Sequence, residues 1–500
     1  MRLKMMARAT PVLAIALLAV ACDNGFTGLN ENPNAPSSVT PQYLFPNGIT
    51  NIVGTVRGGG FDLTFTSLWA QQIAMDRFTD EDRYSMRPGN IDGWWSGFYS
   101  GGLEDFATIL QQATPDSAPS LAAPALVMKS FTYGIMTDVW GDIPYSEANK
   151  GADGFTPKYD SQQDVYNGIF ADLKSANDML ASGGSGPSYG NADLIYGGDM
   201  AKWQKFANSL RLRYALRLTK VDATTAQAQA TAALAAGVFT SNDDNALLRW
   251  PGDGTNDSPI YNTFRTRDDQ HMSQTLVDTL KHLYIAINGA DTTFDPRLAV
   301  YADPVASRLP DTVYIGAPNG LQDDSAIAIG LSNTSRLGAA YRQRTSPSIL
   351  MTYAEVLFDE AEMAARGWTA GDPAALYNAG IQASMQYNGI PDATIAAYLA
   401  SPRVAFNSAA GLTSELTQIA LQKWIALFGE GSEAYAEYRR TGVPDLKPGP
   451  AVITNPQIVA RRLTYSLAEQ SFNNTNLQAA IANQKGASLN DRVWWDTDTP

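Results

Sequence analysis

The sequence is poor in the residue types that most often build metal centres and covalent cross-links. Cysteine occurs once, at Cys22, and histidine twice, at His271 and His282, in 500 residues. A single cysteine excludes an internal disulfide, so packing must stabilise the folded chain. The sequence contains no HExxH motif and no Cys/His cluster, and we expect both histidines to be exposed rather than zinc ligands. We therefore predict no metal and no cofactor.

Charged residues are also scarce. They make up only 17% of the chain, and the formal net charge is −14. An acidic surface repels phosphate backbones, which argues against nucleic-acid binding. With 44% hydrophobic residues, the chain is long enough and apolar enough to bury a large core.

Long apolar runs are missing except near the N-terminus. Arg2, Lys4 and Arg8 precede an apolar segment, residues 11–20, that is too short to span a bilayer and is typical of a signal peptide. The small residues just before Cys22 resemble a bacterial lipobox, in which the cysteine is acylated. An ordinary secretory signal is the alternative, but acylation also explains why an exported chain has a single cysteine.

These features predict three parts of the chain. Residues 1–21 are a lipoprotein signal peptide, and residues 22–38, rich in Asn, Gly, Pro and Ser, are a flexible tether from the lipid on Cys22. Residues 39–500 form a single folded body.

Helical periodicity dominates that body. Apolar residues recur at spacings of three and four over Ser348–Gly367, and Asp372 and Pro373 supply the N-cap and first residue of a second helix. Two helices joined by so short a turn form an αα-hairpin of tetratricopeptide type. Further helices are predicted over 122–139, 161–180, 200–220, 225–236, 412–428 and 433–440. The predicted fold is mainly α, a tetratricopeptide-like αα-hairpin scaffold with hairpins over about 122–240 and 345–440.

Two segments break the helical pattern, residues 57–102 and 241–344. They are rich in glycine, aromatic residues and turn signals, with one helix-like run at Ser273–Leu283. We interpret them as long loops that form a loop-rich irregular cap lobe. Binding residues concentrate on loops held by a rigid scaffold, so we expect these segments to face the ligand.

The candidate binding residues are aromatic and polar side chains in these two segments. Sugar C–H faces stack on aromatic rings, and sugar hydroxyls pair with Asn, Asp and Arg. Trp94 and Arg83 are the first candidates, and Trp94→Ala is expected to weaken binding with little effect on melting. The others are Tyr84, Trp95, Asp76, Tyr261, Asn262 and Arg265. The opposing interpretation is that neighbouring aromatic residues divide between core and surface.

Eight short blocks, in order along the chain, carry a family resemblance. They are Asn30–Pro36 (NENPNAP), Met136–Tyr145 (MTDVWGDIPY), Phe206–Arg213 (FANSLRLR), Asp295–Arg297 (DPR), Met351–Glu355 (MTYAE), Gln422–Trp424 (QKW), Glu437–Gly442 (EYRRTG) and Arg492–Trp495 (RVWW). Together they resemble the SusD/RagB nutrient-binding outer-membrane lipoproteins, in their SusD-like second branch. The residues themselves favour scaffold roles. Asp138, Trp140, Asp142 and Tyr145 are expected to order the turn after a helix, and Arg211, Arg213 and Arg217 to pair with acids such as Glu355 or Glu362.

The resemblance implies a function without covalent chemistry. A protein of this family is anchored by lipid at the cell surface, on the outer membrane, and covers a SusC-like TonB-dependent β-barrel transporter. It binds a nutrient oligomer, an oligosaccharide or an oligopeptide, and passes it to the barrel. We expect an oligosaccharide because of the aromatic residues, and no catalytic residue. A surface glycoside hydrolase and a protein-binding tetratricopeptide adaptor are the alternatives from other classes.

Overall fold

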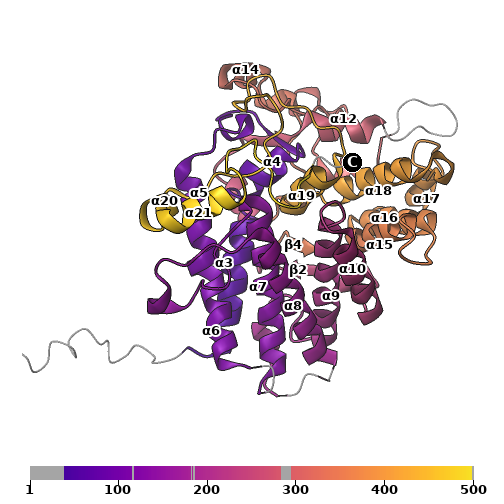
Figure 1. The fold of residues 1–500 in the computed structure, drawn as a ribbon. Coiled ribbons are helices and arrows are strands. Elements are labelled where there is room, and N and C mark those ends of the chain that lie inside the picture. The colour runs from indigo at the N-terminus through magenta and orange to yellow at the C-terminus, as the bar shows by residue number, and fades with distance from the viewer. Residues whose placement is uncertain (1–38, 115–116, 182, 184–185, 283–293, 498–500) are drawn as a thin grey trace, which may run out of the picture. The chain divides into compact units, whose positions relative to one another are not determined.

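The computed structural model describes residues 39–114, 117–181, 183, 186–282 and 294–497. The predicted signal peptide, Cys22 and the tether lie outside these residues. Pro41–Pro500 form one compact unit, in which helices predominate (Figure 1). None of the helices in the described part of the chain is both long and apolar enough to cross a membrane.

Four consecutive helices form the centre of the scaffold. They are α7 (Pro119–Trp140), α8 (Gln162–Ala181), α9 (Met200–Arg217) and α10 (Ala223–Ala236). Each packs against the next, as Figure 1 shows. Aspartate caps begin two of them, since Asp199 accepts hydrogen bonds from the backbone N–H groups of Ala201 and Lys202, and Asp222 from that of Thr225. The predicted helical-hairpin fold is confirmed.

A second group of helices follows the cap segment. It comprises α15 (Tyr353–Ala365), α16 (Pro373–Tyr387), α17 (Asp392–Leu399), α18 (Leu412–Ala426) and α19 (Gly431–Thr441). Asp372 caps α16 through the N–H of Ala374, with Pro373 as its first residue, as predicted. The start of α15 differs from the prediction because Ser348–Met351 form strand β4, antiparallel to β2 (Ala246–Leu248). Pairing with a segment distant in sequence overrides the local helical period there.

The N-terminal segment is more helical than its sequence suggests. It contains α3 (Pro41–Val56), α4 (Ser67–Trp69), α5 (Pro88–Phe98) and α6 (Glu104–Gln112). Much of 57–102, predicted as loops, is therefore helix. In α5 the buried residues Ile91, Trp94, Trp95 and Phe98 follow helical spacing, and their burial outweighs the three glycines at 89, 93 and 97.

Short elements make up the second cap segment. Strand β3 (Gln270–Met272) pairs antiparallel with β1 (Ile73–Met75), and the helices are α11 (Pro259–Phe264), α12 (Gln274–His282), α13 (Leu298–Tyr301) and α14 (Asp323–Ile329). Helix α12 confirms the predicted helical run. Two further helices, α20 (Leu467–Phe472) and α21 (Asn474–Asn483), precede the C-terminal residues.

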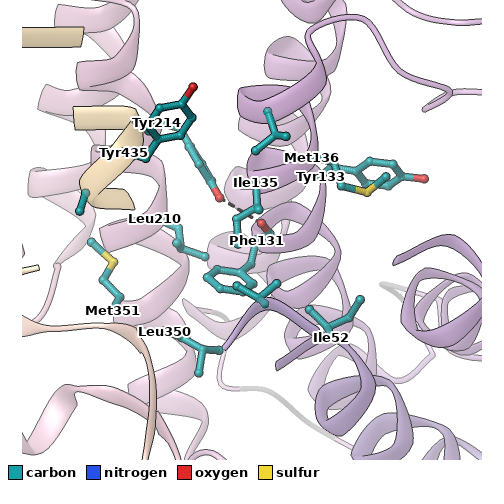
Figure 2. Packing of buried hydrophobic residues seen from close by; sticks show 14 of the residues in the cluster. Ile52, Phe131, Tyr133, Ile135, Met136, Leu210, Tyr214, Leu350, Met351 and Tyr435 are labelled. Atoms are coloured by element: carbon teal, nitrogen blue, oxygen red, sulfur yellow. Dashed lines mark hydrogen bonds between the residues drawn. The ribbon is translucent and has the colours of Figure 1, made fainter. Parts of the chain in front are cut away.

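The core between α7 and α9 shows how closely the scaffold helices pack. Figure 2 shows Phe131 of α7 near Leu210 of α9 and Leu350 of β4, with the Tyr214 hydroxyl donating to the Phe131 carbonyl oxygen at 3.3 Å. A Cβ at Gly134 would lie 2.2 Å from the Tyr214 hydroxyl oxygen. A glycine at this position is therefore needed for the close packing of the two helices.

Ionised side chains also lie inside the scaffold. Arg213 Nε donates to Glu355 Oε1 at 2.6 Å, which confirms the predicted pairing. Arg217 pairs instead with α19, through Glu433 at 2.6 Å and Glu437 at 2.9 Å, and with Asp138 at 3.3 Å. These residues are all buried. Burial disfavours the charge on Arg217, but the carboxylates outweigh burial and raise its pKa.

Scaffold roles were also predicted for Arg211 and for the aspartates at the end of α7 and in the turn after it. Arg211 Nε donates to Gln229 Oε1 at 2.7 Å rather than to an acid. Asp142 Oδ1 accepts from the Gln162 N–H at 2.9 Å, as expected for a turn. Asp138 instead accepts from a distant side chain, the Trp495 indole N–H, at 2.7 Å.

Candidate ligand-binding pocket

A cavity of about 510 Å³ lies between the C-terminal end of α3, helix α5 and the segment that leads into α11. Two tryptophans line it, Trp94 and Trp250, and we call it the Trp94–Trp250 pocket. The remaining lining residues are Gly54, Thr55, Gly58, Gly59, Gly60, Phe61, Gly93, Thr255, Asn256, Asp257, Pro259 and Asn262. Its volume falls in the range of about 300–1,000 Å³ that is usual for small-molecule sites.

Consecutive glycines after α3 allow this cavity to form. A Cβ at Gly59 would lie 2.0 Å from Thr263 Oγ1, and one at Gly60 would lie 3.1 Å from Trp94 Nε1. Side chains at these positions would push α11 and Trp94 away from the end of α3. The glycine run, which looked like loop composition, thus brings the backbone close to both.

The two tryptophans present different surfaces to the pocket. Trp94 is only 7% exposed and packs edge-to-face on Phe61, with ring centroids 5.3 Å apart, and beside Phe65 at 5.9 Å. Trp250 is half-buried, and its indole N–H donates to Ser348 Oγ at 2.9 Å. That hydrogen bond fixes the Trp250 ring while leaving part of it accessible. Trp250 therefore offers more surface for stacking than Trp94 does.

Polar groups reach the cavity from the turn that follows Trp250. Asp253 Oδ1 accepts from the backbone N–H groups of Thr255 and Asn256, at 2.8 and 2.7 Å, and Asp257 Oδ1 accepts from that of Gly254 at 2.9 Å. Asn256 is exposed. The Asn256 amide donates to Asp253 Oδ2 at 3.2 Å, so the aspartates hold the turn in one conformation with this exposed amide at its edge.

Arg344 supports this turn from outside. Its Nη2 lies 3.0 Å from Asp257 Oδ2, and its guanidinium lies over the Tyr261 ring, 5.5 Å from the centroid. Hydrogen bonding from Arg344 lowers the pKa of Asp257, so this carboxylate stays ionised at neutral pH. Asn262, on the next turn of α11, is exposed and lines the same cavity.

The other candidates from the first cap segment lie away from this pocket. Tyr84 is 3% exposed and packs edge-to-face on Trp69, and Trp95 is 6% exposed and packs on Trp140. Arg83 is paired with Asp80. Asp76 is buried, and its Oδ2 accepts from the Thr334 hydroxyl at 2.6 Å. Of this group, only Trp94 lines the cavity.

The candidates from the second segment share α11 and its end. Tyr261 is half-buried beneath Arg344, Asn262 lines the cavity, and Arg265 is exposed at the C-cap of the helix. The structure therefore brings Trp94 and Asn262 together from distant parts of the chain, with Tyr261 at the margin.

One of the two histidines departs from its expected exposure. His282 is exposed on α12, but His271 lies on β3 and is fully buried, with Nδ1 2.7 Å from Thr334 Oγ1 and 3.1 Å from Asp76 Oδ2. Burial lowers the pKa of His271 and raises that of Asp76. The prediction failed because pairing of β1 with β3 supplies the polar partner, and no local pattern shows it. Within the described ranges, no group of three or more His, Cys, Asp or Glu side chains could hold a metal ion.

Sequence reasoning missed most of the lining residues of the pocket, among them Trp250, Asn256 and Asp257. A tryptophan directly before the Pro251–Gly252 turn, followed closely by Asp253, Asn256 and Asp257, could have marked a rigid polar loop with a ring at its base. That turn was noted only as a sign of irregular chain.

Fold and pocket define a protein built on helical hairpins, with a cavity lined by tryptophan and amide side chains. The chain belongs to the second SusD-like family, described as "Starch-binding associating with outer membrane", whose model matches residues 33–466. Members of this family are nutrient-binding proteins associated with the outer membrane. A comparison with curated proteins gave no match.

Solved structures of related proteins share the whole fold. A chitin-binding protein is 29% identical with a TM-score of 0.77, covering 91% of this chain and 100% of its own. A chitin-binding SusD homologue from Flavobacterium johnsoniae is 27% identical with a TM-score of 0.80, covering 92% and 99%. A SusD homologue from Bacteroides uniformis is 26% identical with a TM-score of 0.76, covering 91% and 100%.

Proposed function

We propose that this protein binds an oligosaccharide at the cell surface, in the Trp94–Trp250 pocket, and delivers it to a SusC-like TonB-dependent transporter. It is anchored to the outer membrane through lipid on Cys22 and catalyses no reaction. Family membership supports uptake of a nutrient, and two similar structures are of chitin-binding proteins. The observation that carries the proposal is the pairing of a partly exposed indole, Trp250, with amide groups around one cavity.

The chemistry of the pocket suits a neutral sugar. The accessible part of the Trp250 ring can cover the C–H face of a pyranose, because flat apolar surface is buried there without loss of a hydrogen bond. The amides of Asn256 and Asn262 can both donate to and accept from hydroxyl or acetamido groups. Asp257 holds the turn through Arg344 and Gly254 and acts as a positioning residue.

Among the residues proposed from sequence, Trp94 and Asn262 are therefore the ligand contacts. Tyr261 and Arg265, on α11 and at its C-cap, extend the proposed site for a longer oligomer. Arg83 and the buried residues Asp76, Tyr84 and Trp95 support the fold around them. We add Trp250 and Asn256 to the proposed binding residues.

The test is titration calorimetry with chito-oligosaccharides and malto-oligosaccharides of equal length. Trp250→Ala is expected to weaken binding of the preferred series roughly tenfold, since ring contacts are worth about 0.5–1.5 kcal/mol beyond the area they bury. Asn262→Ala is expected to weaken it about two- to tenfold through a lost hydrogen bond.

The matched control is Tyr43→Ala. Tyr43 is a 74% exposed aromatic residue on α3, roughly 16 Å along the helix from Gly54 at 1.5 Å per residue. Its substitution should leave affinity unchanged. Binding of oligopeptides but of neither sugar series would favour the oligopeptide alternative, and unchanged sugar affinity in both pocket variants would place the site elsewhere.

The partner is tested separately. Gentle detergent extraction of the native protein from its own membranes should recover a TonB-dependent barrel in a fixed ratio. A protein that elutes alone would contradict the delivery step while leaving the sugar site intact.

A further inference from the structure

A second cavity, of about 450 Å³, lies among the C-terminal end of α9, helix α15, the first turns of α18 and the end of α19. We call it the Lys220 pocket. One part of its wall is cationic and another is apolar. The cationic residues are Lys220, Arg366 and Arg440, and the apolar residues are Leu412, Leu416 and Val443.

The two arginines of this wall already have acidic partners. Glu362 accepts from Arg440 Nη1 and Nη2 at 2.8 and 2.6 Å, and it lies 2.8 Å from Arg366 Nη2. Arg440 also contacts Glu437 at 2.8 Å. Burial opposes the charge of Glu362, but Arg440 and Arg366 outweigh burial and lower its pKa to about 2. Glu362 and Glu437 are thus both paired with arginines.

Lys220 differs from both arginines. Within the described residues its ammonium group has neither an ion pair nor a hydrogen bond, although the side chain is half-buried. The neighbouring acid Asp496 is engaged by Arg461 and by Arg492, at 2.8 Å in each case. Burial, followed by repulsion from Arg440, lowers the pKa of Lys220. Asp496 is the acid that acts on Lys220 electrostatically, and burial together with repulsion from the neighbouring arginines outweighs its attraction. A partly desolvated positive charge without a direct ion pair therefore lines the cavity.

The apolar part of the wall is accessible. Leu412 is 46% exposed, and Leu416 and Val443 are half-buried beside the same cavity. A ligand with an apolar chain would remove this surface from water, with a gain of about 25 cal/mol per Å². The pocket thus combines a free cation with an apolar surface.

We propose that the Lys220 pocket binds a small organic carboxylate with an apolar chain, its carboxylate against Lys220 and its chain against Leu412, Leu416 and Val443. Charge complementarity selects the head group, since the lining has three basic residues and a single acid, Glu362, which is already paired with both arginines. This site is independent of the proposed sugar pocket, and its lining residues are different.

Calorimetry with octanoate tests the proposal, with two comparators that have the same chain, octylamine and octyl glucoside, all below their micelle concentrations. Octanoate should bind to the unmodified protein, and neither comparator should bind comparably. Lys220→Met should weaken octanoate binding about tenfold, because a half-buried ion pair is worth more than an exposed one. Lys174→Met makes the same charge change at an exposed position on α8 and should have no effect.

A second variant tests whether the alkyl chain of the ligand contacts the apolar wall of the Lys220 pocket. Leu416→Ser should weaken octanoate binding several-fold, because apolar contact with the alkyl chain is lost. Absent octanoate binding, equal binding of octyl glucoside, or unchanged affinity in Lys220→Met would each overturn the proposal. Octanoate, octylamine and octyl glucoside are all tested on the unmodified protein, so these results do not depend on whether a variant folds.

Discussion

Arg217 provides the sharpest test of how this scaffold is stabilised. Its guanidinium is fully buried and faces three carboxylates, Asp138, Glu433 and Glu437, within 3.3 Å. Arg217→Met keeps a long, unbranched and roughly similar side chain but removes the charge. The variant leaves the carboxylates in place with fewer cationic partners.

The expected cost is about 3–5 kcal/mol, the usual result of removing one member of a buried ion pair. The cationic partners that Glu433 and Glu437 retain limit this loss of stability. Glu433 keeps Arg213 at 3.5 Å, and Glu437 keeps Arg440 at 2.8 Å and Lys423 at 3.3 Å. We therefore expect the lower half of that range, which is still a large share of a typical stability of 5–15 kcal/mol.

Urea unfolding followed by circular dichroism measures this loss as a shift of the midpoint at unchanged slope. Lys174→Met is the control, because the Lys174–Asp178 pair is more than half exposed and should contribute less than about 0.5 kcal/mol.

The pH dependence separates lost charge pairing from lost packing. In the unmodified protein the arginines outweigh burial and lower the pKa of Glu433 and Glu437, so the stability they contribute is present above about pH 4.3 and is lost on acidification. In Arg217→Met these acids protonate at higher pH. The stability difference between the two proteins should therefore shrink as the pH falls from 7 towards 4. A difference independent of pH, or a loss no larger than that of Lys174→Met, would refute the reasoning.

Three other expectations follow from particular residues. Trp94→Ala should destabilise the protein by about 3–5 kcal/mol, because Trp94 packs on Phe61 and Phe65; this reverses the expectation from sequence, and an unchanged melting temperature would contradict the packing. Cys22→Ala should move the protein from membranes to soluble fractions on cell fractionation, whereas retention in the membrane would contradict lipid anchoring. Arg440→Met should raise the pKa of Glu362 from about 2 towards its ordinary value, and NMR titration of a labelled Glu362 carboxyl that shows no rise would contradict the ion pair.

Local patterns predicted the scaffold well because helices are stabilised by short-range rules. The cap at Asp372, the proline at 373 and the apolar run over α7 all act within a few residues, and the structure has these features where they were expected. The helical arginines were predicted to pair with helix-borne acids such as Glu355 or Glu362. Arg213 pairs with Glu355 as expected, whereas Arg217 pairs with other acids and Arg211 with Gln229. Prediction from local sequence was wrong where a distant partner decides the structure. The start of α15 was predicted as helix but forms β4, and His271 was predicted to be exposed but is buried.

In the Trp94–Trp250 pocket, too, local sequence was informative only where no distant segment decides the outcome. Sequence could mark Trp94 and Asn262 as candidates by residue type, but it could not tell them from Trp95 or Tyr84, which have similar chemistry and are buried elsewhere. Trp250 was missed because its role depends on Ser348, which holds its ring from a strand far along the chain.

The sequence by itself determined the helical-hairpin fold, the family and the export signal expected at the N-terminus, because periodicity, caps and ordered motifs are properties of neighbouring residues. Only the tertiary structure decided which aromatic rings remain accessible and which cations lack a partner. The accessibility of a ring and the pairing of a cation both depend on how much of the side chain is covered by segments remote in sequence. This burial determines how much ring surface is left for stacking and how strongly a charge interacts with its neighbours.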